Sequence, residues 1–246
     1  MRRLLAMALT LAILMPAAAK EIIPLPRPRP AEAPPAAPSE PSACVLDLAD
    51  RATIEPLGAL AGPGACGAPD AVRLNTIMMP NHSRVALTPP PTLRCSMAQA
   101  ITDWVRAEVG GIAQTLGAPL VAIENYDSYE CRGMNRVAGA KLSEHGKANA
   151  LDIRSVKLVD GRVIQLTPVT APRAFRERIR ESACARFMTV LGPGSDGYHE
   201  EHVHVDLAER HGDYRICHWE IHEPAETADV PLPRPRPFTL SSGPRL

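Results

Sequence analysis

The 246-residue sequence predicts an α+β fold in which helices pack against a small antiparallel β-sheet. Residues 44–222 carry apolar side chains at helical spacing in two segments, and branched or alternating side chains in three others. One of these runs contains Asp160-Gly161, a pair that favours the tight turn of a β-hairpin. A region of this length also suits one ordinary domain.

Two segments are expected to be helical. Residues 95–117 place their large apolar side chains near one face, and Gly117 is suited to end the helix. Residues 172–192 begin at Pro172, end at Gly192 and repeat apolar side chains at helical spacing. The apolar positions are Met97, Ile101, Trp104, Val105 and Ile112 in the first helix, and Phe175, Ile179, Ala183, Phe187 and Val190 in the second.

Three other segments are expected to form strands. Residues 119–126 are rich in branched side chains, which favour a strand. Residues 150–166 are expected to form two strands joined at Asp160-Gly161. Residues 202–207 alternate strictly between polar and apolar side chains, as a strand with two different faces does.

The first 19 residues have the form of a secretory signal peptide. Arg2 and Arg3 precede an apolar run over residues 4–15, and three alanines ending at Ala19 offer a cleavage site. The run is shorter than the ~20 apolar residues that a membrane span needs. We therefore expect export across the inner membrane to the periplasm, with no stable membrane span after cleavage. The alternative is an uncleaved membrane anchor.

Proline-rich segments flank the predicted domain. Residues 20–43 and 223–246 lack apolar periodicity, which predicts an extended linker before the domain and a Pro/Arg-rich tail after it. The heptapeptide PLPRPRP occurs at 24–30 and again at 231–237. We interpret both copies as solvated spacers. The alternative is weak attraction of their arginines to an anionic polymer.

The charges and the cysteines restrict the class of protein. The chain has 27 basic and 27 acidic residues. Such a balance gives no bulk attraction to nucleic acid, so we expect no nucleic-acid partner. An even number of cysteines in an exported chain favours disulfides, and six cysteines allow ~15 pairings among which sequence cannot choose. The six are Cys44, Cys66, Cys95, Cys131, Cys184 and Cys217, none in C-x-x-C spacing.

Two short stretches together predict a metal site. On a strand over HVHVDL, His202, His204 and Asp206 share one face, and Val203 and Val205 lie on the other.

In LSEHGKANALDI, residues 142–153, small residues separate His145 from Asp152, so the imidazole can fold back beside the carboxylate. A catalytic zinc takes three ligands from His, Asp or Glu and keeps one position open. His145, Asp152 and one histidine of HVH supply such a set. The alternative for each stretch alone is an ordinary exposed loop or sheet face.

These motifs resemble a known group of zinc peptidases. The pattern Ser143-x-His145-x-x-x-x-Ala150-x-Asp152, followed by His199-x-x-His202-x-His204, is similar to that of D-Ala-D-Ala carboxypeptidases, murein endopeptidases and hedgehog-like domains. Over residues 44–222 the chain is identified as a member of the bacterial extensin-like protein C-terminal domain family. The resemblance implies a hedgehog/D-Ala-D-Ala-peptidase-like zinc fold.

The resemblance also implies roles for individual residues. His145, Asp152 and His204 match the three zinc ligands, and Arg132 matches the arginine that holds a substrate carboxylate or carbonyl. Ser143 matches a serine that hydrogen-bonds near the metal.

The identity of the general base is left open among Glu201, His199 and His202. His202 is also a candidate for a residue that assists the base. A regular strand would turn Glu201 away from His204, which favours a histidine. Ala148 stands where the family commonly has glycine, a mild change if its φ is negative.

The function that this implies is zinc-dependent hydrolysis of peptidoglycan peptides, at a D-amino-acid crosslink, by an endopeptidase or carboxypeptidase. The alternative is a non-catalytic module on the same fold that binds the cell wall. A structural wall protein of the plant extensin kind is excluded because the proline-rich segments are short and lack Ser-Pro repeats. HWEIH, residues 218–222, lacks the glutamate of the H-E-x-x-H helix and is interpreted as structural.

Overall fold

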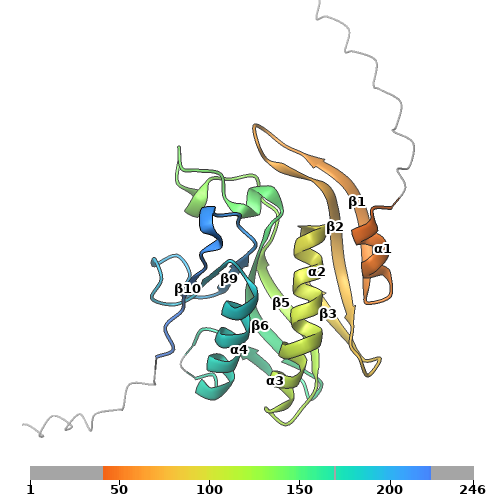
Figure 1. Cartoon of the computed structure of the whole chain (residues 1–246). Coiled ribbons are helices and arrows are strands. Elements are labelled where there is room, and N and C mark those ends of the chain that lie inside the picture. Colours follow the sequence, from red (N-terminus) through yellow and green to blue (C-terminus); the bar gives the residue numbers. More distant parts are fainter. Residues whose placement is uncertain (1–40, 169, 223–246) are drawn as a thin grey trace, which may run out of the picture. The chain divides into compact units, whose positions relative to one another are not determined.

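The computed structural model describes residues 41–168 and 170–222 (Figure 1). The predicted signal peptide at 1–19, nearly all of the linker at 20–43 and the tail at 223–246 lie outside the described residues, as do both copies of PLPRPRP. Among the described residues no helix is both long and apolar enough to cross a membrane.

The described residues form one mixed sheet of ten strands. Its order is β1-β2-β3-β5-β6-β9-β8-β10, with β4 also paired to β2 and β7 to β6. The pairs β3–β5 and β8–β10 are parallel, and the other pairs are antiparallel. The strands are β1 Ala52–Ala61, β2 Gly67–Met78, β3 Arg84–Thr88, β4 Thr92–Arg94, β5 Leu120–Asp127, β6 Ala150–Leu158, β7 Val163–Gln165, β8 Thr189–Leu191, β9 Val203–Asp206 and β10 Ile216–His218.

The α+β class is therefore confirmed. The prediction of a small, purely antiparallel sheet was wrong, since the sheet of the described residues has ten strands and two of its pairs are parallel. The expected strands agree with β5, with the β6–β7 hairpin and with β9. Residues 52–94 add four strands that were not predicted. In β1, Pro56 and Gly58 accompany register shifts that interrupt the alternation, and β3 and β4 are only five and three residues long. β3 pairs in parallel with β5 because β4 and a helical segment carry the chain across between them.

The helices agree with the predictions in part. The segment expected at 95–117 is α2 Cys95–Trp104, a π-helical turn η1 Val105–Val109 and α3 Gly110–Gln114, which confirms a helix there. The segment expected at 172–192 is helical only as α4 Arg173–Arg186. Residues 187–192 were predicted wrongly, since Phe187 is extended and β8 follows, paired with β9 and β10. The remaining short helices are α1 Ala43–Ala49, η2 Met134–Arg136, η3 Glu144–Lys147 and η4 His211–Asp213.

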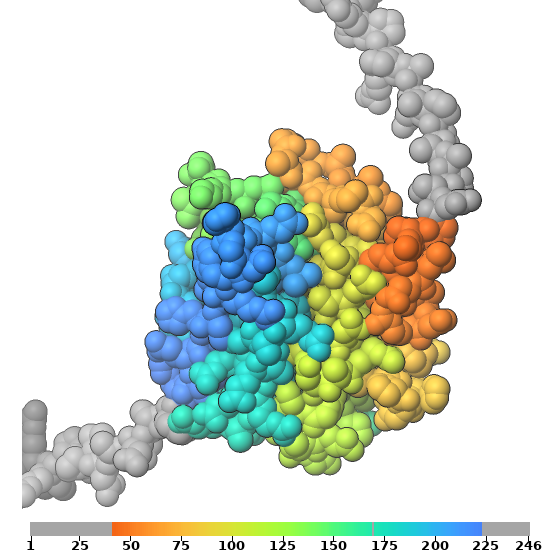
Figure 2. Space-filling model, in the orientation of Figure 1, coloured from red at the N-terminus to blue at the C-terminus, as the bar shows by residue number. Residues whose placement is uncertain are grey.

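Helices α2 and α4 cover one face of the sheet, and their side chains close over it (Figures 1 and 2). Trp104 of this helical layer packs edge-on against Phe187, with ring centroids 5.3 Å apart. Leu151, Ile153 and Val205 of the central strands β6 and β9 belong to the same apolar core. Because side chains alternate along a strand, the residues between them face the opposite side of the sheet.

All six cysteines form disulfides, as their number and the export prediction indicated. Cys44 pairs with Cys95, Cys66 with Cys131 and Cys184 with Cys217. The second bridge is the one that concerns the site, because it ties the β1–β2 hairpin to the loop after β5.

Candidate metal centre

The candidate metal centre lies on the face of β6 and β9 away from the helices. In the antiparallel ladder, Asp152 of β6 is the direct partner of His204 of β9. Directly opposed residues have Cβ atoms ~4.5–5.5 Å apart, so the ladder itself brings the carboxylate and the imidazole together. Leu151 pairs with Val205 on the other face and anchors both strands in the core.

His145 reaches the same point from the short helix η3. Ser143 caps this helix, and its hydroxyl accepts a hydrogen bond from the backbone N–H of His145 at 3.3 Å. The helix ends at Ala148, which has a positive φ of +52°. Alanine stands here where the family commonly has glycine, and because its backbone is left-handed, this replacement is not a mild one. The left-handed turn at Ala148 leads the chain directly into β6.

Three donor atoms meet at this point. Nε2 of His145 lies 3.2 Å from Oδ1 of Asp152 and 3.2 Å from Nδ1 of His204, and Nδ1 of His204 lies 2.8 Å from the same Oδ1. All three side chains are buried. The set of His145, Asp152 and His204 is thus brought together as predicted, in a form that could hold a metal ion.

The outer nitrogen of each histidine contacts a group that only accepts hydrogen bonds. Nδ1 of His145 contacts the backbone carbonyl of Ser128, and Nε2 of His204 lies 3.0 Å from Oδ2 of Asp206. The outer nitrogens can donate these hydrogen bonds, and the inner nitrogens, Nε2 of His145 and Nδ1 of His204, face Oδ1 of Asp152 and are then the ones suited to bind a metal.

The electrostatics of the cluster agree with this arrangement. Burial raises the pKa of Asp152, but hydrogen bonds from His145 and His204 outweigh it and hold the pKa well below its usual range. Burial lowers the pKa of His204, but its hydrogen bonds to Asp152 and Asp206 dominate and raise that pKa to about 9. With this raised pKa, a proton on His204 would compete with a metal ion for the same nitrogen below a pH of about 9.

An open groove of about 1010 Å³ gives access to the cluster. Its lining includes all four residues predicted to act beside the metal, namely Arg132, His199, Glu201 and His202. We call residues 128–147 the first rim, residues 194–202 the second rim, and the facing parts of β6 and β9 the floor.

Arg132 lies in the first rim within a network of ion pairs. Its guanidinium contacts Asp127 at 3.0 Å and Glu130 at 2.7 Å, and Arg136 contacts the same two carboxylates. Cys131 carries the disulfide to Cys66, so covalent and ionic bonds both hold this part of the rim. Arg132 is therefore positioned at the groove, with part of its hydrogen-bonding capacity already used.

The three candidate bases of the second rim differ in how they are held. His199 is 7% exposed, and its Nδ1 lies 2.7 Å from Oδ1 of Asp196. The ring of His202 stacks on Tyr126 at 4.7 Å, and its Nε2 lies 3.4 Å from Oδ2 of Asp152. Glu201 is exposed, and it precedes β9, so strand alternation does not decide its direction.

Sequence reasoning did not assign a role to Asp206, Asp196 or Tyr126. Asp206 was visible as the third polar residue on the face of His202 and His204, and that alternation was a usable signal. Asp196 precedes His199 by three residues in a loop, and Tyr126 lies on β5, so neither contact follows from a periodic pattern.

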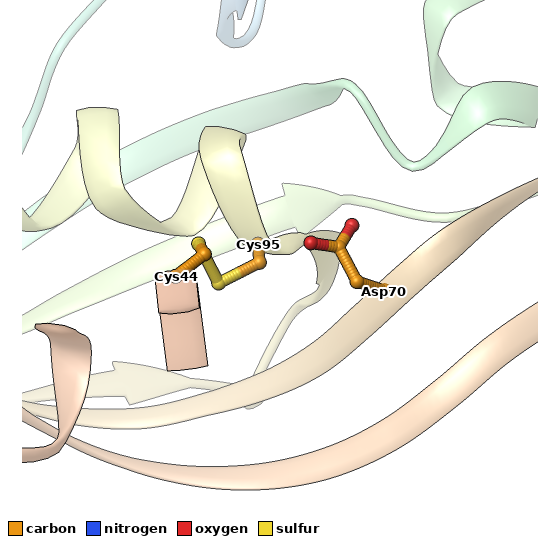
Figure 3. A group of neighbouring side chains, drawn as sticks. All are labelled: Cys44, Asp70 and Cys95. Carbon is orange, nitrogen blue, oxygen red and sulfur yellow. A yellow bond between two sulfur atoms is a disulfide. The ribbon is translucent and has the colours of Figure 1, made fainter. Parts of the chain in front are cut away.

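A second group of possible ligands does not form a metal site. Cys44, Cys95 and Asp70 lie close together, but the two sulfur atoms are bonded to each other, with Asp70 beside them on β2 (Figure 3). A disulfide sulfur has no thiolate to offer a metal. The two histidines of HWEIH, His218 and His222, are exposed, and Trp219 between them is buried in the core.

Comparison with protein-family models gives a match to the extensin-like protein C-terminus over residues 42–218. The match spans well over half of the chain, so the chain belongs to this family. No curated protein and no solved structure matches the chain significantly.

Proposed function

We propose that this extensin-like family member is a zinc-dependent hydrolase that cleaves peptide crosslinks of peptidoglycan. The observation that carries the proposal is the convergence of Nε2 of His145, Oδ1 of Asp152 and Nδ1 of His204 at the bottom of an open groove. A buried structural metal site would have no need of such a groove, because structural zinc sites are closed.

The donor set fits zinc. Bonds of ~2.0–2.2 Å in a tetrahedral arrangement separate neighbouring ligand atoms by roughly 3.3 Å. The three observed separations of 2.8, 3.2 and 3.2 Å are close to that spacing. Asp206 and the carbonyl of Ser128 supply the outer hydrogen bonds that zinc-binding histidines usually make. Zinc bound there would polarise a peptide carbonyl and make water a nucleophile at neutral pH.

The residues of the chain then have separate tasks. Among the predicted bases, His199 is supported best, since Asp196 holds its Nδ1 and its ring centroid lies 5.6 Å from that of His204. Arg132 supplies positive charge at the groove for the carbonyl oxygen or a carboxylate of the substrate. His202, held against Tyr126 and Asp152, lines the groove beside the ligands and assists rather than acting as the base.

The choice of a cell-wall peptide rests on the resemblance and on the predicted export. The motifs of residues 143–152 and 199–204 are similar to those of peptidases that act on D-amino-acid bonds. We therefore propose a relation to their hedgehog-like zinc fold, and a periplasmic site of action where peptidoglycan is accessible. A D-Ala-containing crosslink is the proposed bond.

The test is mass spectrometry of crosslinked muropeptides incubated with the mature chain, residues 20–246, and one equivalent of zinc. We expect new fragments whose masses together equal that of the substrate plus one water, and none with His145→Ala. A matched control is His211→Ala, which changes a histidine outside the ligand set. Intact muropeptides with a zinc-loaded, folded wild-type protein would contradict the proposal.

A cell-wall-binding module on the same fold is the second candidate. It is favoured by the ion pairs of Arg132 with Asp127 and Glu130, which leave less of the guanidinium to stabilise the charge that develops during hydrolysis. Binding of muropeptides by the folded, zinc-loaded wild-type protein without cleavage would support this candidate in place of the enzyme.

A further inference from the structure

His199 and Asp196 form a hydrogen-bonded pair within the second rim. Oδ1 of Asp196 lies 2.7 Å from Nδ1 of His199. The imidazole is 7% exposed and lines the groove, with its ring centroid 5.1 Å from that of His202 and 5.6 Å from that of His204. No hydrogen bond of its other nitrogen, Nε2, to the described residues is found. Nε2 is thus the nitrogen with capacity for a ligand in the groove.

Asp196 is itself held from two sides. Its Oδ1 accepts a hydrogen bond from the backbone N–H of Tyr198 at 3.0 Å, and its Oδ2 accepts one from the side-chain amide of Asn135 at 3.3 Å. Asn135 belongs to the first rim, so this contact crosses the groove. Burial raises the pKa of Asp196, but the hydrogen bonds from His199 and Tyr198 dominate and lower it. A carboxylate that is charged and fixed in this way can only accept from His199.

We propose that Asp196 is a positioning residue that keeps the proton of neutral His199 on Nδ1 and so directs the lone pair of Nε2 into the groove. The inference rests on the proposed hydrolase function and adds to it a residue that sequence reasoning did not mark. His199 is then the group that takes a proton from the attacking water.

The proton balance of this step is complete. The oxygen of water bonds to the peptide carbon, and one proton of that water moves to Nε2 of His199. The carbon–nitrogen bond then breaks, and the same proton passes from Nε2 to the amine that leaves. The net change is the addition of one water across one amide bond, with His199 returned to its starting tautomer.

The other candidate bases lack such an arrangement. Nε2 of His202 already lies 3.4 Å from Asp152, and its ring is fixed against Tyr126. Glu201 is exposed and makes no hydrogen bond to the described residues that would orient it. Among the three candidate bases, only His199 is oriented by a carboxylate of the described residues that is not itself a proposed metal ligand.

Asp206 provides a matched control because it makes the same type of bond to a different histidine. Asp206 contacts Nε2 of His204, a proposed metal ligand, whereas Asp196 contacts a histidine outside the ligand set. Replacing either aspartate by asparagine keeps the shape but adds an N–H donor, so the histidine is no longer confined to one tautomer. The two substitutions should therefore affect different properties.

The first experiment measures zinc affinity and muropeptide hydrolysis for Asp196→Asn and Asp206→Asn in the full mature chain. For Asp196→Asn we expect kcat to fall by roughly 10²–10⁴-fold, with KM and zinc affinity changed by less than about threefold, and no recovery in excess zinc. For Asp206→Asn we expect zinc affinity to fall by ~10–100-fold and activity to recover when zinc is added. An unchanged kcat in Asp196→Asn would overturn the inference.

The second experiment separates this inference from the proposed function. Long-range ¹H–¹⁵N spectra of the histidine side chains at pH 8 report the tautomer of His199, whose signals are assigned by their loss in His199→Gln. We expect the Nδ1–H tautomer in the wild type and a mixture or the Nε2–H tautomer in Asp196→Asn. If this holds while the wild type cleaves nothing, Asp196 positions His199 and the hydrolase proposal fails. An Nε2–H tautomer in the wild type would overturn the inference regardless of activity.

Discussion

The floor of the groove and its rims are held in place by different kinds of bond. Asp152 and His204 lie opposite each other in the ladder of β6 and β9, and apolar partners on the other face bury both strands. The rims have little ladder pairing and depend on a disulfide, ion pairs and side-chain hydrogen bonds. They also contain left-handed residues other than glycine, such as Asn135 and Arg136. The proposed metal ligands thus lie mainly on strands, and the groups that would meet a substrate lie on loops.

The proposed roles of floor and rims therefore predict that metal binding and catalysis can be disturbed separately. Strand ladders fix atoms with many cooperative backbone bonds, whereas loops open locally at lower free-energy cost. Changes in the floor should remove the metal, and changes in the rims should spare the metal and lower turnover. His145 is the one proposed ligand that comes from a rim, through its capped helix η3.

The largest effect is expected in the floor, from Asp152→Asn. The substitution removes the negative charge that both histidines contact, and with it one of the three proposed ligands. A whole structural zinc site provides ~10–16 kcal/mol, so losing one ligand should weaken zinc binding by on the order of 1000-fold or more. A chelator competition titration measures this.

Asp160→Asn, in the exposed turn between β6 and β7, is the control and should bind zinc as the wild type does. Zinc affinity of Asp152→Asn within tenfold of the wild type would show that the metal is not held at the floor.

The rims are tested by removing their disulfide with the double substitution Cys66→Ser/Cys131→Ser. Its 65-residue separation predicts a loss of about 4 kcal/mol in the free energy of unfolding, measured by denaturant titration. We expect turnover to fall at a temperature where the variant stays folded, because Arg132 follows Cys131 directly. Zinc affinity should stay within about threefold of the wild type.

The matched control is Cys44→Ser/Cys95→Ser, which opens a 51-residue separation between α1 and α2, outside both rims, and should cost about the same stability. Turnover per folded molecule should survive in this control. Equal losses of turnover in both variants would show that the rim disulfide has no effect on catalysis beyond its contribution to stability.

A smaller effect is expected from pH, and it again concerns the floor. The pKa of His204 is raised to about 9 by Asp152 and Asp206 against the effect of burial, and zinc must displace that proton. Zinc affinity should therefore rise from pH 7 to pH 9 by roughly 50-fold and then level off. Affinity measured across this range, together with the number of protons released from calorimetry in two buffers, provides the check.

The stability of the metal-free protein should change with pH in the opposite direction to its zinc affinity. The raised pKa of His204 adds to the free energy of unfolding. This contribution is complete below the unfolded-state pKa of ~6.5 and is lost as the pH rises through the folded-state pKa of about 9. The pKa of Asp152 is lowered, so its contribution is present above ~4 and does not change in this window. Metal-free protein should thus lose stability between pH 7 and 9 while its zinc affinity increases. A zinc affinity independent of pH would contradict the assigned proton.

The same division explains how much could be read from the sequence. The ligand residues could be named because strand alternation and the spacing of His145 and Asp152 are local patterns, whereas the ladder that sets Asp152 opposite His204 was not predicted. In the rims, the predicted residues Arg132, His199, Glu201 and His202 do line the groove. The contact of Asp196 with His199 was not predictable, since it depends on a loop whose Gly194 and Gly197 adopt positive φ. Such backbone conformations leave no periodic trace in a sequence.

Two failures in the fold have similar causes. Phe187 continues the apolar spacing of α4, so the helical pattern extends beyond the end of the helix. The residues that follow are buried because β8 pairs with β9 in the sheet, not because they lie on a helix face. In β1, Pro56 and Gly58 and the accompanying register shifts conceal the strand that they bend. In both cases contacts between distant segments, which no single window contains, decide the local structure.

The smallest effect is expected where floor and rim join, from Ala148→Gly. A left-handed alanine costs roughly 1–2 kcal/mol, which glycine relieves. Glycine also loses a buried methyl group worth ~0.8 kcal/mol and adds ~0.5–1 kcal/mol of unfolded-state entropy. These contributions nearly cancel, so the free energy of unfolding should change by less than about 1 kcal/mol.

Ala150→Gly is the control, because Ala150 is equally buried but lies in β6, where there is no such strain to relieve. That variant should lose about 1–2 kcal/mol. Equal losses at both positions in denaturant titrations would show that Ala148 carries no strain, and that the turn into the floor needs no glycine at all.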